Sequence, residues 1–231
     1  MLVPHPSGGY RFLPGIEPYS CGVRAAPGFE LVRARLQRPL PWTAGFDLIE
    51  AHLAASGLGR TALCAAELRS PAPVSLADFA RFNRLWCARL RAWELFVGEA
   101  NPVARTNVAP MLAPPATQVL LAFCYVQPAP AAGGPCLARP GFVVAGAGEL
   151  VDGALTESGI VRRGETGPEA LAAKMDFVLK VIEERLSGLH ASWAETTAVV
   201  AYTARVPPGP ALMQLLARLG AAAGTHGLQW V

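Results

Sequence analysis

The feature that most constrains the fold is one order of strand and helix patterns that occurs twice, on either side of a segment rich in proline and glycine. Between Gln127 and Pro140 the chain has four prolines and the pair Gly133-Gly134 among small residues. This composition resists both helix and strand. We therefore predict two domains, residues 1–127 and 141–231, joined by a linker at residues 128–140.

The first half predicts two pairs of a strand and a helix. A strand at residues 29–36 precedes a helix that ends at Gly57 and whose apolar positions recur at helical spacing: Phe46, Ile49 and Leu53. A second strand is predicted at residues 62–68, and Ser75 is a candidate N-cap for a helix over residues 76–93. The apolar residues of that helix are expected on one face: Phe79, Phe82, Leu85, Trp86 and Leu90.

The second half repeats this order. A strand is predicted at residues 142–147, followed by an amphipathic helix marked by Leu171, Met175, Val178, Ile182 and Leu186. A strand at residues 196–203 and a helix at residues 210–222 follow, the helix weakened by Gly220. Glu183, Glu184 and Arg185 are expected on the solvated face of the first of these helices.

The two halves also share a short phrase, Ile-Glu-Ala-His-Leu at residues 49–53 and Ile-Glu-Glu-Arg-Leu at residues 182–186. Each is followed by a turn of small residues and by a strand that ends at Arg69 or Arg205. The shared order and spacing predict a duplicated α+β unit. Each unit would be a mostly antiparallel sheet with two helices packed on one face, so the other face needs a partner.

The composition agrees with a compact protein that hides apolar surface. The chain is 52% hydrophobic and 16% charged, and its mean hydropathy of +0.31 favours a homo-oligomer. A net charge of +3 without a long run of lysine and arginine gives no footprint for nucleic acid. No apolar stretch reaches the length of a membrane span or a signal peptide, which predicts a cytoplasmic protein.

The cysteines and histidines give no ligand set for a metal. The five cysteines form no C-x-x-C pair and are widely spaced, so we expect reduced and mostly buried thiols: Cys21, Cys64, Cys87, Cys124 and Cys136. The histidines have no metal-binding spacing: His5, His52, His190 and His226. We expect neither a metal nor an organic cofactor.

Arg105 is the residue that most needs an explanation. It lies between Asn101-Pro102 and a strand-like run at residues 119–126, and a buried guanidinium is costly unless an anion meets it. One interpretation is a structural salt bridge to Glu67 or Glu99, and the other is a carboxylate ligand.

Three separated pieces of the first half resemble the RidA (YjgF, L-PSP) family: Ile-Glu-Pro-Tyr-Ser at residues 16–20, Asp-Phe-Ala-Arg-Phe-Asn at residues 78–83, and Ala-Arg-Thr-Asn-Val at residues 104–108. The resemblance implies the chorismate-mutase-like fold in two tandem copies, and assembly as a trimer with sites between subunits. The second half has none of the three pieces and resembles a diverged copy.

Members of that family hydrolyse enamines and imines to 2-oxo acids and ammonia. The resemblance implies that Arg105 binds the substrate carboxylate as a fork, that Tyr19 lines the pocket and that Asn83 supports the wall or the arginine, with Asn107 of the same motif also binding substrate. From the residues alone, Tyr19 is equally a half-buried aromatic whose hydroxyl caps the backbone, and Asn83 equally hydrogen-bonds a loop.

The sequence departs from the family at one position. Many active members carry a glutamate in the last strand, where Ala122 stands here. General acid-base catalysis contributes about 10²- to 10⁴-fold, so the catalytic prediction weakens. Glu67 is the candidate replacement acid, although spacing alone does not tell which sheet face it takes. In the second half, residues 225–231 stand where a strand bearing an equivalent arginine is expected, and they contain no arginine. Either the sequence stops one strand early, or another segment completes this edge of the sheet.

Two functions follow from these observations. The first is hydrolysis of a small enamine or imine that carries a carboxylate, with Arg105, Tyr19 and Glu67 as catalytic candidates. The second is a noncatalytic sensor or scavenger that binds a small acid in the same pocket. A ribonuclease is disfavoured because no basic patch is present.

Overall fold

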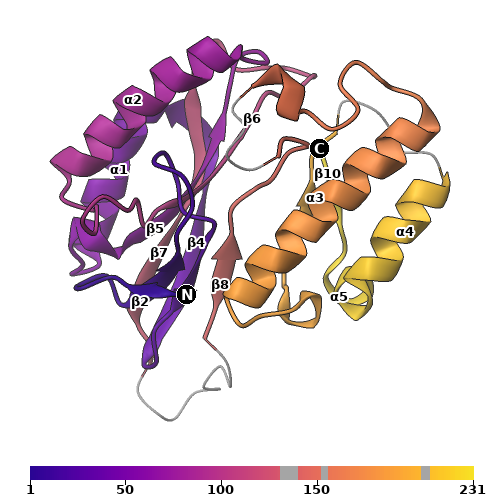
Figure 1. Ribbon diagram of the computed structural model, residues 1–231. Helices are drawn as coiled ribbons and strands as arrows, with labels where there is room; N and C mark the ends of the chain where they lie inside the picture. Colours follow the sequence, from indigo (N-terminus) through magenta and orange to yellow (C-terminus); the bar gives the residue numbers. More distant parts are fainter. Residues whose placement is uncertain (131–139, 152–155, 204–208) are drawn as a thin grey trace. The chain divides into compact units, whose positions relative to one another are not determined.

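The computed structural model describes residues 1–130, 140–151, 156–203 and 209–231, and the chain divides into two compact units, Met1–Gly146 and Ala147–Val231 (Figure 1). The second unit therefore begins later than residue 141, where the sequence placed it. Strand β8 (Phe142–Val144) pairs antiparallel with β3 (Gly22–Ala25) and so belongs to the first unit. Residues 131–139 of the predicted linker, with Cys136, lie outside the described residues, as does Arg205.

The first unit is built on a four-stranded sheet in the order β4-β7-β5-β6. Its strands are β4 (Phe29–Pro41), β5 (Leu63–Arg69), β6 (Ala104–Val108) and β7 (Val119–Pro128). Strand β7 is antiparallel to both β4 and β5, whereas β5 and β6 are parallel. A parallel neighbour needs a long crossover connection, and the helix between β5 and β6 provides it.

Helices α1 (Trp42–Ala55) and α2 (Leu76–Ala92) pack on one face of this sheet (Figure 1). The predicted N-cap is confirmed, because the Ser75 hydroxyl oxygen accepts a hydrogen bond of 3.1 Å from the Asp78 backbone nitrogen. Leu85, which we predicted on the buried face of α2, is 58% exposed, and Asn83 and Cys87 are buried instead. The buried stripe of α2 is thus rotated towards a polar residue.

A second sheet, in the order β1-β2-β3-β8, packs against the other face of the first. It adds β1 (Val3–Pro4) and β2 (Tyr10–Leu13) to β3 and β8. Phe12 and Val23 of this sheet share a buried cluster with Cys64 and Cys124. The face that we expected to need a partner molecule is therefore covered in part by the same unit.

The second unit consists mainly of helices: α3 (Pro168–Gly188), α4 (Gly209–Leu219) and α5 (Ala221–His226). Its strands β9 (Val200–Ala201) and β10 (Gln229–Trp230) are parallel to one another. The mostly antiparallel sheet predicted for this half is not present among its described residues. The predicted second helix breaks at Gly220, whose φ of +58° is incompatible with a continuous helix.

The order of elements in the second unit matches part of the first. Helix α3, strand β9, helix α4 and strand β10 occur in the same order as α1, β5, α2 and β6, with the additional short helix α5 between α4 and β10, and the two strands are parallel in both cases. A strand therefore follows the second helix of each unit. In the second unit that strand carries Gln229 and Trp230, not an arginine. The chorismate-mutase-like assignment stays a prediction.

Candidate functional site

Arg105 lies on β6 with its side chain on the helix-covered face of the main sheet. Its register partner on β5 is Ala66, which belongs to the core between sheet and helices. The side chain is 4% exposed. Its Nη2 donates a hydrogen bond of 2.7 Å to Oδ1 of Asn83, on the buried stripe of α2. The family-like pieces at residues 78–83 and 104–108 thus meet in space.

Four aromatic rings surround the Arg105 guanidinium. Its Cζ lies 5.3 to 5.9 Å from the ring centres of Tyr19, Phe79, Phe82 and Trp86. Aromatic faces attract a cation through their quadrupole, more strongly where water is excluded. Burial lowers the pKa of Arg105 to about 10, while Tyr19 and Cys87 act in the opposite direction. The group therefore keeps its positive charge at neutral pH.

The salt-bridge interpretation of Arg105 is wrong for the described part of the chain. The carboxylate of Glu67 pairs with Arg33, and that of Glu99 lies 3.2 Å from Nη2 of Arg91. Nη1 of Arg105 is buried and has no hydrogen-bond partner among the described residues, and the same holds for the indole nitrogen of Trp86. Two buried donors without acceptors are unfavourable, and an anionic ligand would satisfy the positively charged one.

Tyr19 reaches Arg105 because its loop is fixed to the segment before β6. Ser20 donates from its backbone nitrogen to the Val103 carbonyl and from its hydroxyl to the Pro102 carbonyl, at 3.0 and 2.9 Å. The Asn101 side-chain nitrogen donates to the carbonyl oxygen of Glu17 at 3.0 Å. These contacts hold the half-buried Tyr19 ring over the guanidinium, so the structure brings together the first and third family-like pieces as well.

Asn107, two residues after Arg105 on β6, belongs to a polar cluster with Ser70 and Gln118. Its Oδ1 accepts a hydrogen bond of 2.8 Å from Nε2 of Gln118 and lies 3.0 Å from the Ser70 hydroxyl. The same hydroxyl lies 2.9 Å from Oε1 of Gln118. Alternate residues of a strand point to the same face, so Asn107 shares the face of Arg105. Ser70 and Gln118 were not predicted, because no motif marks them.

Glu67 lies on the other face of the sheet. Its register partners are Thr106 on β6 and Ala122 on β7, whereas Arg105 pairs with Ala66. The Arg33 guanidinium binds the Glu67 carboxylate with two hydrogen bonds of 2.5 and 2.9 Å. Glu67 therefore stands opposite the position where the family glutamate was expected, but the structure does not bring it to Arg105.

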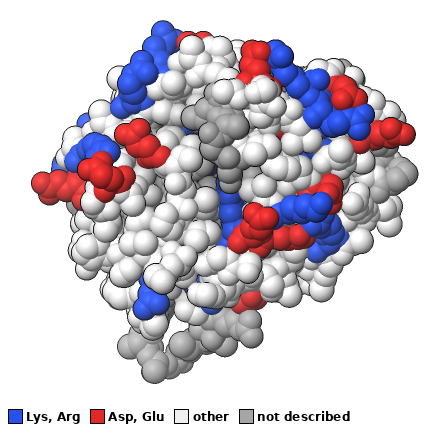
Figure 2. All heavy atoms as spheres, in the orientation of Figure 1, with Lys and Arg blue, Asp and Glu red and all other residues white. Residues whose placement is uncertain are grey.

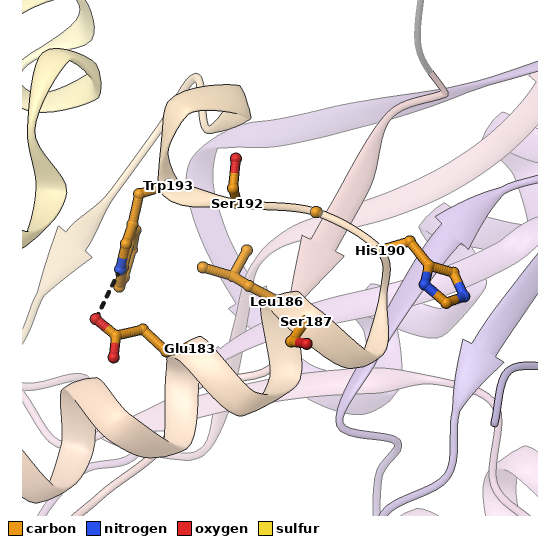
Figure 3. Close-up of a pocket in the computed structure, with 7 residues that line it drawn as sticks. Glu183, Leu186, Ser187, His190, Ser192 and Trp193 are labelled. Carbon is orange, nitrogen blue, oxygen red and sulfur yellow. Dashed lines mark hydrogen bonds between the residues drawn. The ribbon is translucent and has the colours of Figure 1, made fainter.

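The second unit contains a shallow pocket of about 440 Å³ (Figure 3). It is lined by Glu183, Leu186, Ser187, His190, Ala191, Ser192 and Trp193. The Trp193 indole nitrogen donates to Oε1 of Glu183 at 3.2 Å. The carboxylate in this pocket is thus already engaged, whereas Nη1 of Arg105 has no hydrogen-bond partner among the described residues.

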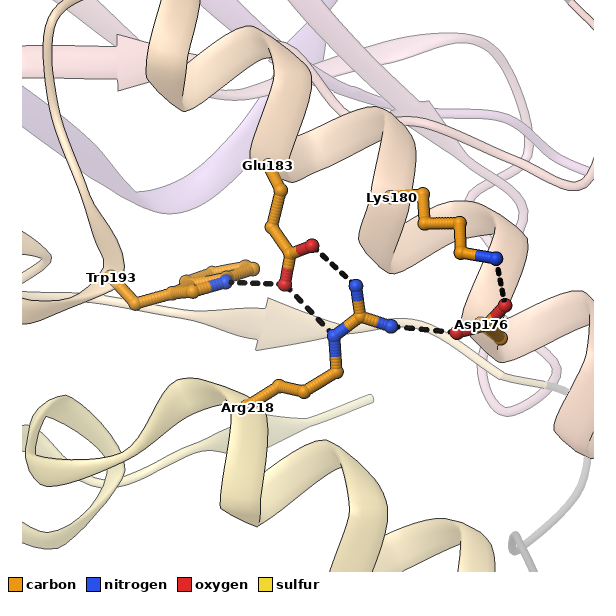
Figure 4. Close-up of polar contacts among 5 residues, drawn as sticks. All are labelled: Asp176, Lys180, Glu183, Trp193 and Arg218. Atoms are coloured by element: carbon orange, nitrogen blue, oxygen red, sulfur yellow. Dashed lines mark hydrogen bonds and ion pairs between the residues drawn. The ribbon is translucent and has the colours of Figure 1, made fainter.

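Glu183 also belongs to an ion-pair network between α3 and α4 (Figure 4). Arg218 donates to Glu183 through Nε at 2.8 Å and through Nη2, and to Oδ1 of Asp176 at 2.7 Å. Lys180 lies 2.7 Å from the other Asp176 oxygen. Arg218 lowers the pKa of Glu183 by hydrogen bonding. The expected solvated face is corrected in part, because Arg185 is buried and Glu183 joins two helices.

Comparison with known proteins identifies the family. The family model for 2-aminomuconate deaminase CnbZ matches residues 2–231. The chain belongs to this deaminase family. A 2-amino-5-chloromuconate deaminase from Comamonas testosteroni is 39% identical over 224 residues, which cover 96% of this chain and 86% of that protein. No solved structure matches the chain.

The charges on the surface of this deaminase family member are mixed in sign. On the face shown in Figure 2, acidic and basic side chains lie near one another without a large patch of one sign. Among the described residues, no group of three or more His, Cys, Asp and Glu is placed to hold a metal ion. None of the described helices combines the length and apolar character needed to cross a membrane. Arg105, with Asn83 and Tyr19 beside it, is the candidate site of this deaminase family member, because its Nη1 is buried without a hydrogen-bond partner among the described residues.

Proposed function

We propose that this chain is a RidA-like enzyme that hydrolyses a 2-aminomuconate-type enamine to a 2-oxo acid and ammonia. The observation that carries the proposal is Arg105, a buried guanidinium that meets no carboxylate of the described chain and leaves Nη1 unpaired. The names of the family and of the Comamonas testosteroni relative supply the substrate class. Both molecules named there are carboxylates with an amino group on the neighbouring carbon.

The reaction needs one water and no oxidant or reductant. Adding a proton to carbon converts the enamine C=C–NH₂ into an iminium C–C=NH₂⁺, which is electrophilic at the nitrogen-bearing carbon. Water adds there, and the C–N bond of the resulting carbinolamine breaks to release ammonia and leave a carbonyl. The 2-oxo acid or its enol is the organic product. Holding the substrate beside water supplies much of the acceleration that such a reaction needs.

The residues at the site have separate tasks in this proposal. Arg105 binds the carboxylate next to the amino group as a charged fork. Asn83 fixes one side of the guanidinium through its 2.7 Å hydrogen bond. The rings of Tyr19 and Phe79 face the guanidinium and offer flat surfaces to a conjugated chain. Ala122 stands where the family glutamate is expected and Glu67 lies on the other face of the sheet, so we expect a modest rate without strong general acid catalysis.

Ammonia release from 2-aminomuconate, measured against buffer, tests this function with the native chain and with Arg105→Ala and Arg105→Lys. We expect release by the native chain and a loss of about a hundredfold or more in kcat/KM for Arg105→Ala, because a buried charge-assisted fork is removed. Arg105→Lys keeps the charge and loses the fork, and should recover only part of the rate. A native rate equal to buffer, with muconate still bound, would leave the small-acid-binding function in its place.

The resemblance to RidA proteins also leads us to propose a homo-oligomer, with a trimer favoured. Large apolar side chains of the first unit support it, because Leu85, Met111 and Leu112 are exposed. Large exposed apolar surfaces often mark contacts between proteins. Light scattering at micromolar concentration should give a multiple of the 24.3 kDa chain mass. A mass of one chain would contradict the proposed assembly.

A further inference from the structure

The polar cluster of Ser70, Asn107 and Gln118 lies beyond Arg105 on the same face of the sheet. Ser70 follows the last residue of β5, and Asn107 is the residue before the last of β6, so both lie at the carboxyl ends of a parallel strand pair. Ser70 is 3% exposed, whereas Asn107 and Gln118 are partly exposed. The cluster is therefore anchored in the core and open on one side.

The hydrogen bonds of the cluster leave Asn107 with a spare donor. Its Oδ1 faces the Gln118 amide nitrogen at 2.8 Å and the Ser70 hydroxyl at 3.0 Å. In the structure the amide oxygen of Asn107 is therefore engaged within the cluster. The Asn107 side-chain nitrogen makes no hydrogen bond with the described residues. An amide NH₂ held in this way is a donor for an oxygen atom brought by a ligand.

The spacing of Arg105 and Asn107 fits a substrate with an acceptor at each end. The Cα atoms of alternate residues in a strand are about 6.6 to 6.8 Å apart. An extended chain of six carbons separates its terminal carbons by roughly 6 Å. We propose that Ser70, Asn107 and Gln118 form a distal subsite that binds the second carboxylate of a six-carbon unsaturated dicarboxylate. This inference rests on the proposed function, which places the first carboxylate on Arg105.

Neutral donors at the distal end have a consequence for selectivity. The Arg105 end binds any small acid, because charge attraction does not depend on the rest of the molecule. The distal subsite adds binding energy only for a ligand that carries an oxygen atom about six carbons away from the carboxylate on Arg105. A hydrogen bond to a charged group contributes more than one between neutral groups, so the cluster should favour dicarboxylates over monocarboxylates of equal length.

Calorimetry with muconate and sorbate tests the subsite without requiring catalysis. Both acids have six carbons and two conjugated double bonds, and sorbate carries a methyl group in place of the second carboxylate. We expect the native chain to bind muconate about ten- to a hundredfold more tightly than sorbate. Asn107→Asp, which places a negative charge against the distal carboxylate, should remove this preference and change sorbate binding by no more than about twofold.

Two further variants separate the subsite from the rest of the molecule. Asn107→Leu should reduce the preference for muconate, and the matched control Gln127→Leu, which removes an amide bound to Glu30 at the other end of the β7 segment, should leave it unchanged. Arg105→Ala should weaken binding of both acids. The far-ultraviolet circular dichroism of each variant should match that of the native chain.

The outcomes distinguish the subsite from the function on which it rests. If the native chain binds muconate and sorbate equally, or binds neither, the distal subsite is overturned. It is also overturned if folded Asn107→Asp weakens both acids by the same factor, since the cluster then only supports the strand. If the preference for muconate and its loss in Asn107→Asp are both seen while 2-aminomuconate releases no ammonia, the subsite stands and the enzymatic function fails.

Discussion

Arg105 and Arg218 both carry a guanidinium that needs hydrogen-bond acceptors, but the acceptors around them differ in charge. Arg218 of the second unit is bound by the carboxylates of Glu183 and Asp176, which both lie on α3 (Figure 4). Arg105 of the first unit is bound by one neutral amide oxygen and by aromatic rings. One guanidinium has its charge balanced by the described chain, and the other does not.

This difference concerns the cost of burying a charge. A buried charge that is paired within the fold stabilises little or nothing beyond an apolar pair of the same size, but a buried charge without a partner is costly. The partner of Arg105 is the neutral amide of Asn83 and not a carboxylate, so the cost of burying the charge is not offset within the described chain. The second unit, in the equivalent order of elements, uses its arginine to join two helices.

Replacing each arginine by methionine should give the largest contrast. We expect Arg105→Met to lower kcat/KM for 2-aminomuconate by about 10²- to 10³-fold, because the carboxylate loses a charged fork. Its thermal stability should be equal or higher, since an unpaired buried charge is removed. Arg218→Met should leave kcat/KM within about twofold and lower stability by about 1 kcal/mol or less. Ammonia release and thermal unfolding measure both, and reversed effects would contradict the comparison.

Asn83→Asp should give Arg105 a carboxylate partner, as Arg218 already has. The new carboxylate would lie where Oδ1 of Asn83 accepts from Nη2 of Arg105 at 2.7 Å, and would compete with the substrate for the guanidinium. We expect KM to rise by about ten- to a hundredfold, while thermal stability stays the same or rises. Asn83→Leu is the matched control, because it removes the hydrogen bond without adding charge and should raise KM less.

Glu183→Gln tests, through the pH dependence of stability, whether the carboxylate partner of Arg218 stabilises the second unit. Hydrogen bonding from Arg218 holds the pKa of Glu183 below its ordinary 4.5. A lowered carboxylate pKa adds stability above pH 4.5, and this contribution is lost as the pH falls through the lowered value. The group is partly exposed, so we expect the variant to be less stable by about 1 kcal/mol or less at pH 7. The difference in unfolding temperature should disappear in acid, and its persistence there would mean that the network is not the cause.

Much of the first unit could be predicted from the sequence because its signals are local. The spacing of Phe46, Ile49 and Leu53 predicted a helix that the structure has at residues 42–55, and Ser75 predicted the start of α2 at Leu76. Local signals do not determine which strands pair. Strand β8 joins the first unit through β3, more than a hundred residues away in the chain, and nothing in residues 142–144 indicated that partner.

The candidate site was predicted in part for the same reason. Arg105, Tyr19 and Asn83 lie in pieces that resemble a family, whereas Ser70 and Gln118 lie in none and become neighbours only when β5 and β7 pair. The face of Glu67 was not predictable because the strand shows no polar and apolar alternation. Ala65 packs against the second sheet and Ala66 against the helices, so both faces of β5 are buried and both carry small residues.

Glu67→Gln should have the smallest effect and decides whether the acid on the far face takes part. The Arg33 guanidinium binds this carboxylate, and Glu67 pairs in register with Thr106, not with Arg105. The pair is partly exposed, so the variant should lose about 1 kcal/mol or less of stability, and kcat should stay within about twofold. A loss of kcat approaching the 10²-fold typical of a missing general acid would show that Glu67 acts on the substrate. Arg33→Gln then separates the two causes, because a structural ion pair predicts equal effects of both variants and a catalytic carboxylate predicts loss only when Glu67 is changed.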